Sequence, residues 1–194
     1  MKRLMIAAAL VAATPAQANW KLVPIGQAQT VAKSGMTVTA ALPWNRSTFR
    51  PGKKAETWTR DGTSVDELIF VGAIGEGEPL LRDRDKKNRP LPLFAKSMLL
   101  PDVTGLFEQT VRLVLDTTMF ETLSSEPTTF GGKPGVRLRY RYVAGDDALE
   151  RTGEMRAAIA GGQLYMMFWT APSIHYHAAG VAGAQALMDS ARLP

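Results

Sequence analysis

The sequence predicts an α+β fold: an antiparallel sheet of about six or seven strands with helices packed on it. One observation is the strict alternation of apolar and arginine side chains over residues 136–143, because successive side chains of a strand point to opposite faces. A second is the Gly161-Gly162 pair between two strand-like segments, since glycine reaches the positive φ angles of tight hairpin turns. The third is a helical spacing of apolar residues over 102–115 and again over 174–191.

Residues 1–18 have the features of a secretory signal peptide. Lys2 and Arg3 give it a positive start, and an apolar core of about ten residues follows. The small residues that precede Asn19 suit signal peptidase, so we expect cleavage after Ala18.

A membrane anchor is the alternative for this segment. A spanning helix needs about 20 apolar residues, and Pro15 and Gln17 interrupt the run before that length. We therefore expect residues 19–194 to be a single soluble domain in the bacterial periplasm or outside the cell, with no stable membrane insertion after cleavage.

The first half of this domain contains most of the shorter predicted strands. Alternation and turn dipeptides predict strands over 36–40, 56–59 and 67–74, and a short edge strand over 29–32. Residues 44–54 are predicted to be a polar loop around a Pro-Gly turn. Its flanking tryptophans, Trp44 and Trp58, are either core residues, which is the favoured interpretation, or an aromatic binding shelf.

Residues 75–92 are predicted to be an exposed, mobile loop, because they combine dense charge with proline and lack apolar periodicity. The basic residues outnumber the acidic ones within the loop. Two interpretations are open: a solvated loop, or a docking site for an acidic partner at four side chains, Arg84, Lys86, Lys87 and Arg89.

The remaining elements follow in order. The helix over 102–115 begins at Pro101-Asp102, residues that suit a helix N-terminus, and its predicted buried stripe is Val103, Leu106, Phe107, Thr110, Val111 and Val114. A strand over 120–129 leads into the three-stranded meander, with strands near 136–143, 151–160 and 163–170 and a turn at 145–147. Ser173 is predicted to cap the last helix, and Ile174 to lie on the buried face of that helix.

Composition excludes several classes of function. The chain has no cysteine, which removes disulfides, thiolate metal sites and cysteine nucleophiles. Loss of Lys2 and Arg3 from the 23 basic and 18 acidic side chains leaves a net charge of +3. That charge is too small for a nucleic-acid-binding protein, which needs a concentrated basic stripe. We expect no metal and no cofactor.

Arg137, Arg139 and Arg141 lie on one face of the 136–143 strand. Like charges at that spacing repel unless carboxylates or a ligand face them, and Glu154 on the next strand is positioned to pair with one of them. The face is therefore either a solvated or salt-bridged outer surface, or a binding surface for a small anionic ligand.

Catalytic motifs are weak in this sequence. The only histidines are His175 and His177, and residues two apart on a helix do not face each other. A Gly-x-Ser-x-Gly elbow is lacking. Residues 72–77 are glycine-rich, but no helix start follows them to bind phosphate. A secreted hydrolase that uses His175 or His177 is kept as the alternative function.

The order of elements resembles the C-terminal half of the PsbP/Mog1/DcrB-like superfamily. The residues that carry the resemblance are the turn over 130–135, the aromatic strand over 164–168 and the closing helix over 176–190. The resemblance extends mainly over residues 100–192. It implies an α/β/α sandwich around a twisted antiparallel sheet and a non-catalytic accessory or binding role. The predicted function is thus that of an exported, non-catalytic envelope protein that binds a partner protein or a small anionic ligand.

Overall fold

The computed structural model describes residues 19–144 and 148–194. The predicted signal peptide and the predicted turn at 145–147 lie outside these residues. Within the described part, eight strands form one antiparallel sheet in the order β1-β4-β5-β6-β10-β9-β8-β7. In chain order they are β1 (Trp20–Leu22), β4 (Asn45–Ser47), β5 (Ala55–Thr59), β6 (Glu67–Ile74), β7 (Phe120–Phe130), β8 (Lys133–Val143), β9 (Glu150–Ala160) and β10 (Gln163–Pro172).

The sheet is larger than the six or seven strands that the sequence predicts. The additional strands, β1 and β4, are three residues long and lie in segments without a clear strand pattern, β4 within the predicted polar loop. Three residues are too few to show alternation, and these strands are defined by pairing: β1 with β4, and β4 with β5. Two predicted strands instead form a separate hairpin, β2 (Ala28–Thr30) with β3 (Thr37–Thr39).

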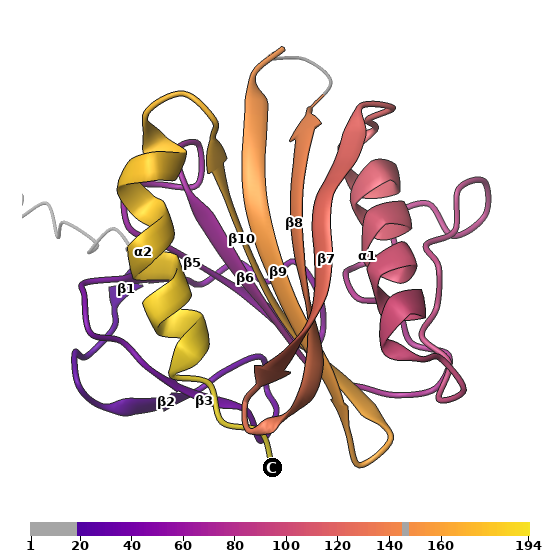
Figure 1. The fold of residues 1–194 in the computed structure, drawn as a ribbon, viewed down its shortest axis with the longest axis horizontal. Coiled ribbons are helices and arrows are strands. Elements are labelled where there is room, and N and C mark those ends of the chain that lie inside the picture. Colours follow the sequence, from indigo (N-terminus) through magenta and orange to yellow (C-terminus); the bar gives the residue numbers. More distant parts are fainter. Residues whose placement is uncertain (1–18, 145–147) are drawn as a thin grey trace, which may run out of the picture.

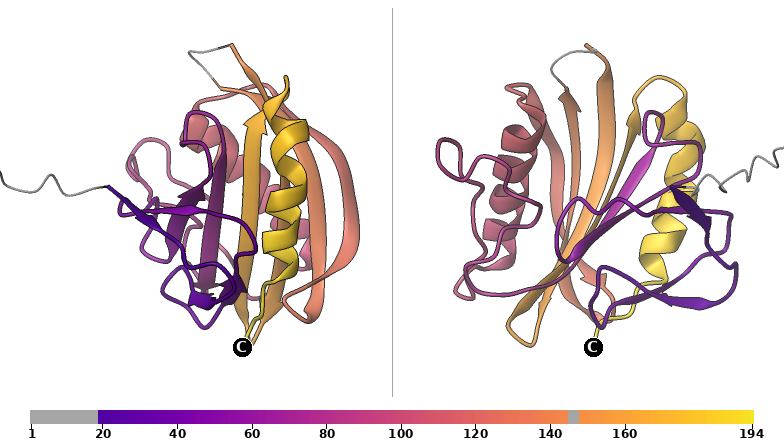
Figure 2. Two further views of the ribbon diagram at one scale, coloured as in Figure 1. Left: turned by 90° about the vertical axis from the view of Figure 1, so that its left-hand side faces the viewer. Right: turned by 180° about the vertical axis from the view of Figure 1, so that it is seen from behind.

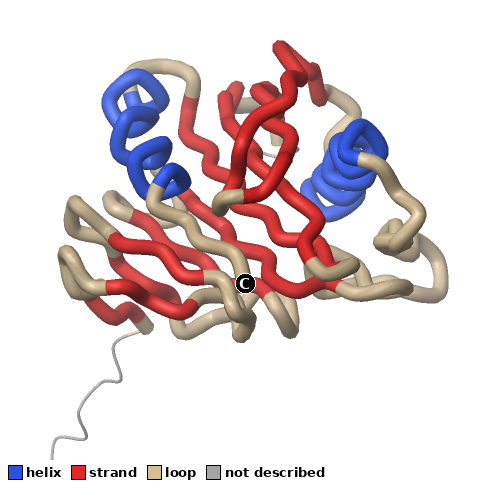
Figure 3. Tube along the Cα trace, turned by 60° about the horizontal axis from the view of Figure 1, so that its bottom comes forward, coloured by secondary structure: helices blue, strands red, loops and turns tan. Residues whose placement is uncertain are grey.

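The two helices, α1 (Leu100–Leu115) and α2 (Tyr176–Asp189), lie on opposite faces of the sheet (Figures 1 and 2). The buried residues of α1 share a core with Leu138 and Phe168, while those of α2 share a second core with Met167 and Trp169. Since Met167 and Phe168 are adjacent on β10, the two cores are on opposite sides of it. The predicted sandwich of helix, sheet and helix is therefore present (Figure 3).

Helix α1 matches the prediction closely. It starts two residues before the predicted 102, with Pro101 in its first turn and the Asp102 carboxylate accepting a hydrogen bond from the Leu99 amide at 2.8 Å. Glu108 and Arg112 form the ion pair expected of residues four apart, at 2.9 Å. Val114, predicted on the buried stripe, is instead 46% exposed.

Helix α2 starts later than predicted. Ser173 does not cap it; its hydroxyl lies 2.7 Å from that of Thr152 on β9. The helix begins at Tyr176, after His175 in a left-handed conformation with φ of 65°. Ile174 consequently lies outside the helix and is 77% exposed, so its predicted place in the core is wrong.

The strand over 133–143 confirms the alternation that predicted it. Val136, Leu138, Tyr140 and Tyr142 are buried on the α1 face. The intervening arginines therefore point to the α2 face. Trp44 and Trp58 are both fully buried in the core beneath α2, as the core interpretation of these residues requires.

The charged segment between β6 and α1 is exposed from Arg84 to Pro90 but anchored at its base. Leu80, Leu81 and Leu91 are buried in the core beneath α1. Hydrogen bonds between the Gly77 amide and the Phe94 carbonyl, at 2.8 Å, and between the Phe94 amide and the Glu78 carbonyl, at 3.0 Å, join its two ends. Neither described helix is long and apolar enough to cross a membrane.

Candidate functional site

The α2 face of β8 carries the three arginines singled out by the sequence. In the antiparallel register, Arg137 lies opposite Arg156 of β9, Arg139 opposite Glu154, and Arg141 opposite Thr152. Helix α2 packs mainly over β10 and β9, while Arg139 and Arg141 of β8 stay exposed on this face. The arginines thus lie between the helix and the edge of the sheet.

Glu154 is the central acceptor of this surface. It is 3% exposed, and its carboxylate accepts hydrogen bonds from Arg137 at 2.7 Å, from Arg156 at 2.7 Å and from Gln185 of α2 at 2.8 Å. Burial raises the pKa of Glu154, but the hydrogen bonds from Arg137, Gln185 and Arg156 outweigh it and hold the pKa below its ordinary value. Glu154 is therefore ionised at neutral pH, and Asp189 of α2 also pairs with Arg156.

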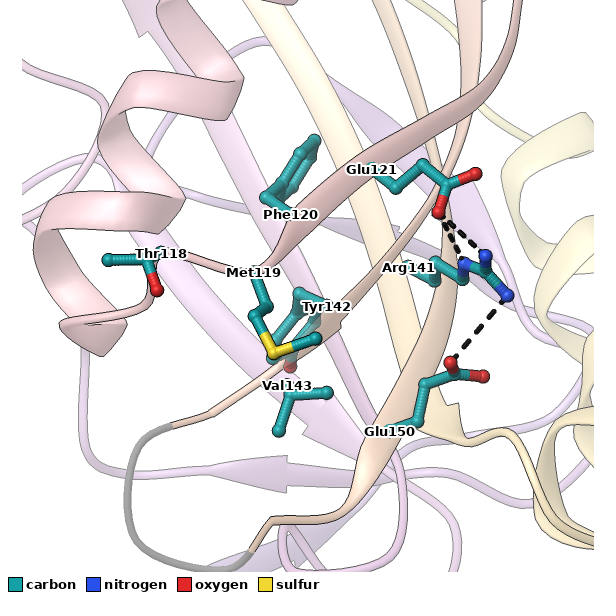
Figure 4. A pocket seen from close by; sticks show the side chains of 8 residues that line it. All are labelled: Thr118, Met119, Phe120, Glu121, Arg141, Tyr142, Val143 and Glu150. Atoms are coloured by element: carbon teal, nitrogen blue, oxygen red, sulfur yellow. Dashed lines mark hydrogen bonds and ion pairs between the residues drawn. The ribbon is translucent and has the colours of Figure 1, made fainter.

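Arg141 is neutralised by two carboxylates. Its guanidinium lies 2.7 Å from Glu121 of β7 and 3.6 Å from Glu150 of β9. Figure 4 shows the small hollow beside these residues, about 210 Å³ in volume, at the ends of the strands. Among the described residues that line this hollow, Arg141 is the only cation, and two carboxylates lie beside its guanidinium. The hollow is therefore not suited to an anion.

Arg139 differs from its two neighbours. It is exposed, and within residues 19–144 and 148–194 its side chain has no ion pair or hydrogen bond. Glu154, opposite it, already binds Arg137, Arg156 and Gln185. Ser124 lies opposite Arg139 on β7, next to the register shift after Thr122. It is partly exposed, and its hydroxyl has no hydrogen bond within the described residues.

His177 of α2 also belongs to this site. Its ring lies 5.5 Å from that of the buried Trp169, centroid to centroid. Burial lowers the pKa of His177, and the charge of Arg139 lowers it further, while Glu154 raises it by a smaller amount. His177 is therefore mostly neutral at pH 7, and its pKa responds to the charge at Arg139.

Arg139, Ser124 and His177 have side chains of the kinds that bind oxyanions. A guanidinium presents planar donors that match a carboxylate or phosphate, the Ser124 hydroxyl is a further donor, and the His177 imidazole gains a positive charge when it is protonated. The sequence indicates Arg139, but it does not connect Ser124 or His177 with it, because β7, β8 and α2 are brought together only by the fold.

The two histidines differ in their surroundings. His175 is exposed, and its ring contacts that of Tyr176. Among the described residues, neither histidine has a hydrogen bond to a carboxylate or to a serine or threonine hydroxyl, and no group of acidic residues or histidines is arranged to hold a metal ion. The arrangement of nucleophile, base and orienting acid that a hydrolase needs is not present there.

The second set of predicted residues lies elsewhere. Arg84, Lys86, Lys87 and Arg89 are exposed on the segment beside α1, separate from the arginines of β8. Arg89 forms an ion pair of 2.9 Å with Asp116, at the end of α1. The structure therefore contains two distinct cationic surfaces, one in the α2 layer and one in the α1 layer.

The sequence analysis also missed an unusual acid, Glu67. It is partly buried at the start of β6, and burial raises its pKa to about 7 despite the opposing charge of Arg151 and a hydrogen bond with Thr57. Glu67 lines a hollow of about 680 Å³ with Trp20 and Phe49. The one sequence feature that could indicate a buried Glu67 is its position at the start of an apolar strand.

Comparisons with known proteins support the fold. Cyanobacterial PsbP (CyanoP) from Synechocystis sp. PCC 6803 superposes with a TM-score of 0.56 at 16% identity, over 89% of this chain and 95% of that one. The Ran-binding protein Mog1p of Saccharomyces cerevisiae gives 0.48 at 12% identity, over 90% of this chain and 95% of that one.

LpqN of Mycobacterium tuberculosis, described as involved in cell envelope biogenesis, gives a TM-score of 0.33 at 13% identity, over 91% of this chain and 93% of that one. The superposition with PsbP confirms the predicted resemblance at the level of the fold. No protein-family model and no curated protein matches the sequence.

Proposed function

We propose that this chain is an exported, non-catalytic binding module that holds a negatively charged group of a small ligand or partner protein on the α2 face of β8. The observation that carries the proposal is the state of Arg139. Its two neighbours, Arg137 and Arg141, are paired with carboxylates, whereas its own guanidinium is exposed and has no described partner. Ser124 lies opposite it on β7, and the charge of Arg139 lowers the pKa of His177.

Energetic considerations favour a binding role for Arg139. Three arginines at alternate positions repel one another, and Arg137 and Arg141 are compensated by Glu154, Glu126, Glu121 and Glu150. An anion at Arg139 would complete this compensation. It would gain charge-assisted hydrogen bonds from a guanidinium whose backbone is fixed by the sheet, so only the side chain of Arg139 would have to become ordered.

Titration with sulfate and with succinate, followed by NMR of the arginine Nε–H groups, tests the proposal. We expect the Arg139 signal to shift, and R139Q to weaken binding at least tenfold without a change in melting temperature. R84Q, which removes one exposed charge from the α1 layer, is the matched control and should leave binding unchanged. Equal binding by R139Q and the unsubstituted protein would overturn the proposal.

Export rests on the signal-like residues 1–18, with their positive start, apolar core and small residues before Asn19. It is tested by N-terminal sequencing of the protein recovered from the bacterial periplasm or medium. We expect a chain that begins at Asn19. A chain that keeps Met1 and stays with the cytoplasmic fraction would contradict export, without affecting the proposal for Arg139.

A further inference from the structure

The charged segment beside α1, residues 82–89, has a conformation that is held at both ends. Buried Leu80, Leu81 and Leu91 anchor both sides of it, and the Arg82 amide donates to the Pro51 carbonyl at 2.7 Å. In Figure 1 it projects beside α1, on the side of the molecule away from α2. The exposed residues between these anchors therefore form a defined surface.

The two aspartates of this segment, Asp83 and Asp85, are hydrogen-bonded within the segment itself. The Asp83 carboxylate accepts hydrogen bonds from the Leu91 amide at 3.0 Å and from the Asp85 amide at 3.2 Å. The Asp85 carboxylate accepts from the side chain and the backbone amide of Asn88, at 2.9 and 3.3 Å. Both carboxylates thus satisfy the turns of the segment rather than its basic side chains.

The basic side chains point outward. Arg82, Arg84, Lys86 and Lys87 are exposed, and in the part of the chain that the structure describes none of them has an ion pair or a side-chain hydrogen bond. Four basic side chains without an ion pair thus lie within a few residues, where they outnumber the two carboxylates, Asp83 and Asp85. Such a concentration of one charge attracts and orients a partner of opposite charge.

Two hollows flank the segment. One, of about 430 Å³, is lined by four basic and two acidic residues and by apolar residues, including Ile74 and Leu80. The other, of about 370 Å³, is lined by three arginines and two aspartates and by apolar residues of α1 such as Leu113 and Val114. Each volume is in the range of about 300–1,000 Å³ that is common for ligand pockets.

We propose that residues 82–89, together with these two hollows, form a docking surface for an acidic polypeptide segment. Carboxylates of the partner pair with Arg82, Arg84, Lys86 and Lys87, and apolar side chains of the partner enter the hollows. The mixed lining favours a polypeptide over an anionic lipid surface, because a flat membrane pairs with basic side chains through charge alone. This surface is separate from the anion site at Arg139.

Selection from a display library of random short peptides tests this inference. We expect the full chain to enrich peptides that combine several acidic residues with leucine or aromatic residues. R84Q/K86Q/K87Q should reduce the affinity for an enriched peptide at least tenfold and leave the melting temperature unchanged. R139Q should bind that peptide as the unsubstituted protein does, which separates the two proposed sites.

The matched control is K21Q/K33Q/K96Q, which removes the same charge from exposed lysines outside the segment and should change the affinity less than twofold. The inference is overturned if this control loses affinity equally, or if serine in place of the peptide's apolar residues has no effect. It is also overturned if vesicles of phosphatidylglycerol and phosphatidylcholine bind through the segment while no acidic peptide is enriched.

Discussion

Arg139 and Glu154 lie directly opposite each other on neighbouring strands, yet no ion pair joins them. Glu154 instead accepts hydrogen bonds from Arg137, which lies diagonally to it on β8, and from Arg156, two residues along its own strand. It also accepts one from Gln185 of α2. These three donors occupy both oxygens of Glu154, and Arg139 is not bonded to either of them. Arg139 therefore remains exposed in a region where the arginines on either side of it are neutralised.

The position of Glu154 predicts a strong effect on stability. E154A leaves Arg156, which is almost fully buried, and Arg137 without their shared acceptor. We expect a loss of about 3 kcal/mol in the free energy of unfolding, because the remaining charges stay desolvated. Urea denaturation measures this change.

E126A is the matched control, since Glu126 is half-exposed and lies 3.4 Å from Arg137. Its effect should be below about 1 kcal/mol. If the two variants have similar free energies of unfolding, Glu154 does not organise this face.

The ring of His177 predicts that anion binding depends on pH. In the free protein, burial and the charge of Arg139 lower the pKa of His177, so the ring is mostly neutral at pH 7. A bound anion favours the protonated ring, and thermodynamic linkage then requires tighter binding as the pH falls through that pKa. We expect the affinity for sulfate, which does not itself titrate between about pH 5 and 8, to rise on acidification.

Substitution of the imidazole isolates this effect. H177Q should flatten the pH profile while keeping the affinity at pH 8, where the ring carries no charge, and H175Q should behave like the unsubstituted protein. Calorimetric titration at several pH values provides the comparison. A profile that H177Q leaves unaltered would exclude His177 from the site.

Glu67 predicts that part of the stability is lost as the pH rises. Its pKa is raised from an ordinary value of 4.5 to about 7 in the folded protein. Between pH 4.5 and 7 the folded state therefore keeps the Glu67 proton that the unfolded state has released. The contribution of this proton to the free energy of unfolding is present at low pH and is lost as the pH rises toward 7. The full contribution is about 3 kcal/mol.

This contribution appears as the difference between E67Q and the unsubstituted protein, measured by urea denaturation at about pH 5 and 8. E67Q should lack the fall in the free energy of unfolding above pH 5, whereas E126Q should retain it. Parallel pH profiles for E67Q and the unsubstituted protein would show that Glu67 has an ordinary pKa.

Two helical glycines predict opposite effects of the same substitution. At Gly180 of α2, an added Cβ lies 2.7 Å from Cζ2 of the buried Trp169, which cannot move without disturbing the core. We expect G180A to destabilise the protein by about 1–3 kcal/mol. At Gly105 of α1 nothing lies within 4 Å of that Cβ, so G105A should stabilise by up to about 1 kcal/mol.

Thermal unfolding of both variants provides the test. A gain in stability for G180A would mean that α2 does not approach Trp169 this closely. Because both substitutions add one methyl group to a helix, the difference between them reports the contact of α2 with the sheet.

The sequence by itself determined the elements with long and regular patterns. Strand alternation over 136–143 separated the buried tyrosines from the arginines, and apolar spacing located α1 to within two residues. These predictions succeed because local burial repeats with the period of the element. The start of α2 was wrong, since Ser173 bonds to Thr152 of another strand rather than to the helix.

The tertiary structure alone decided which charges remain available. The sequence offered three equivalent arginines on one strand, and only the register with β7 and β9 shows that Glu121, Glu150 and Glu154 reach Arg141 and Arg137 but not Arg139. It also brought His177 of α2 to that region, and the register shift after Thr122 placed Ser124 opposite Arg139. Ion pairing depends on distances between separate elements, and a sequence pattern records the face of a side chain but not its partners.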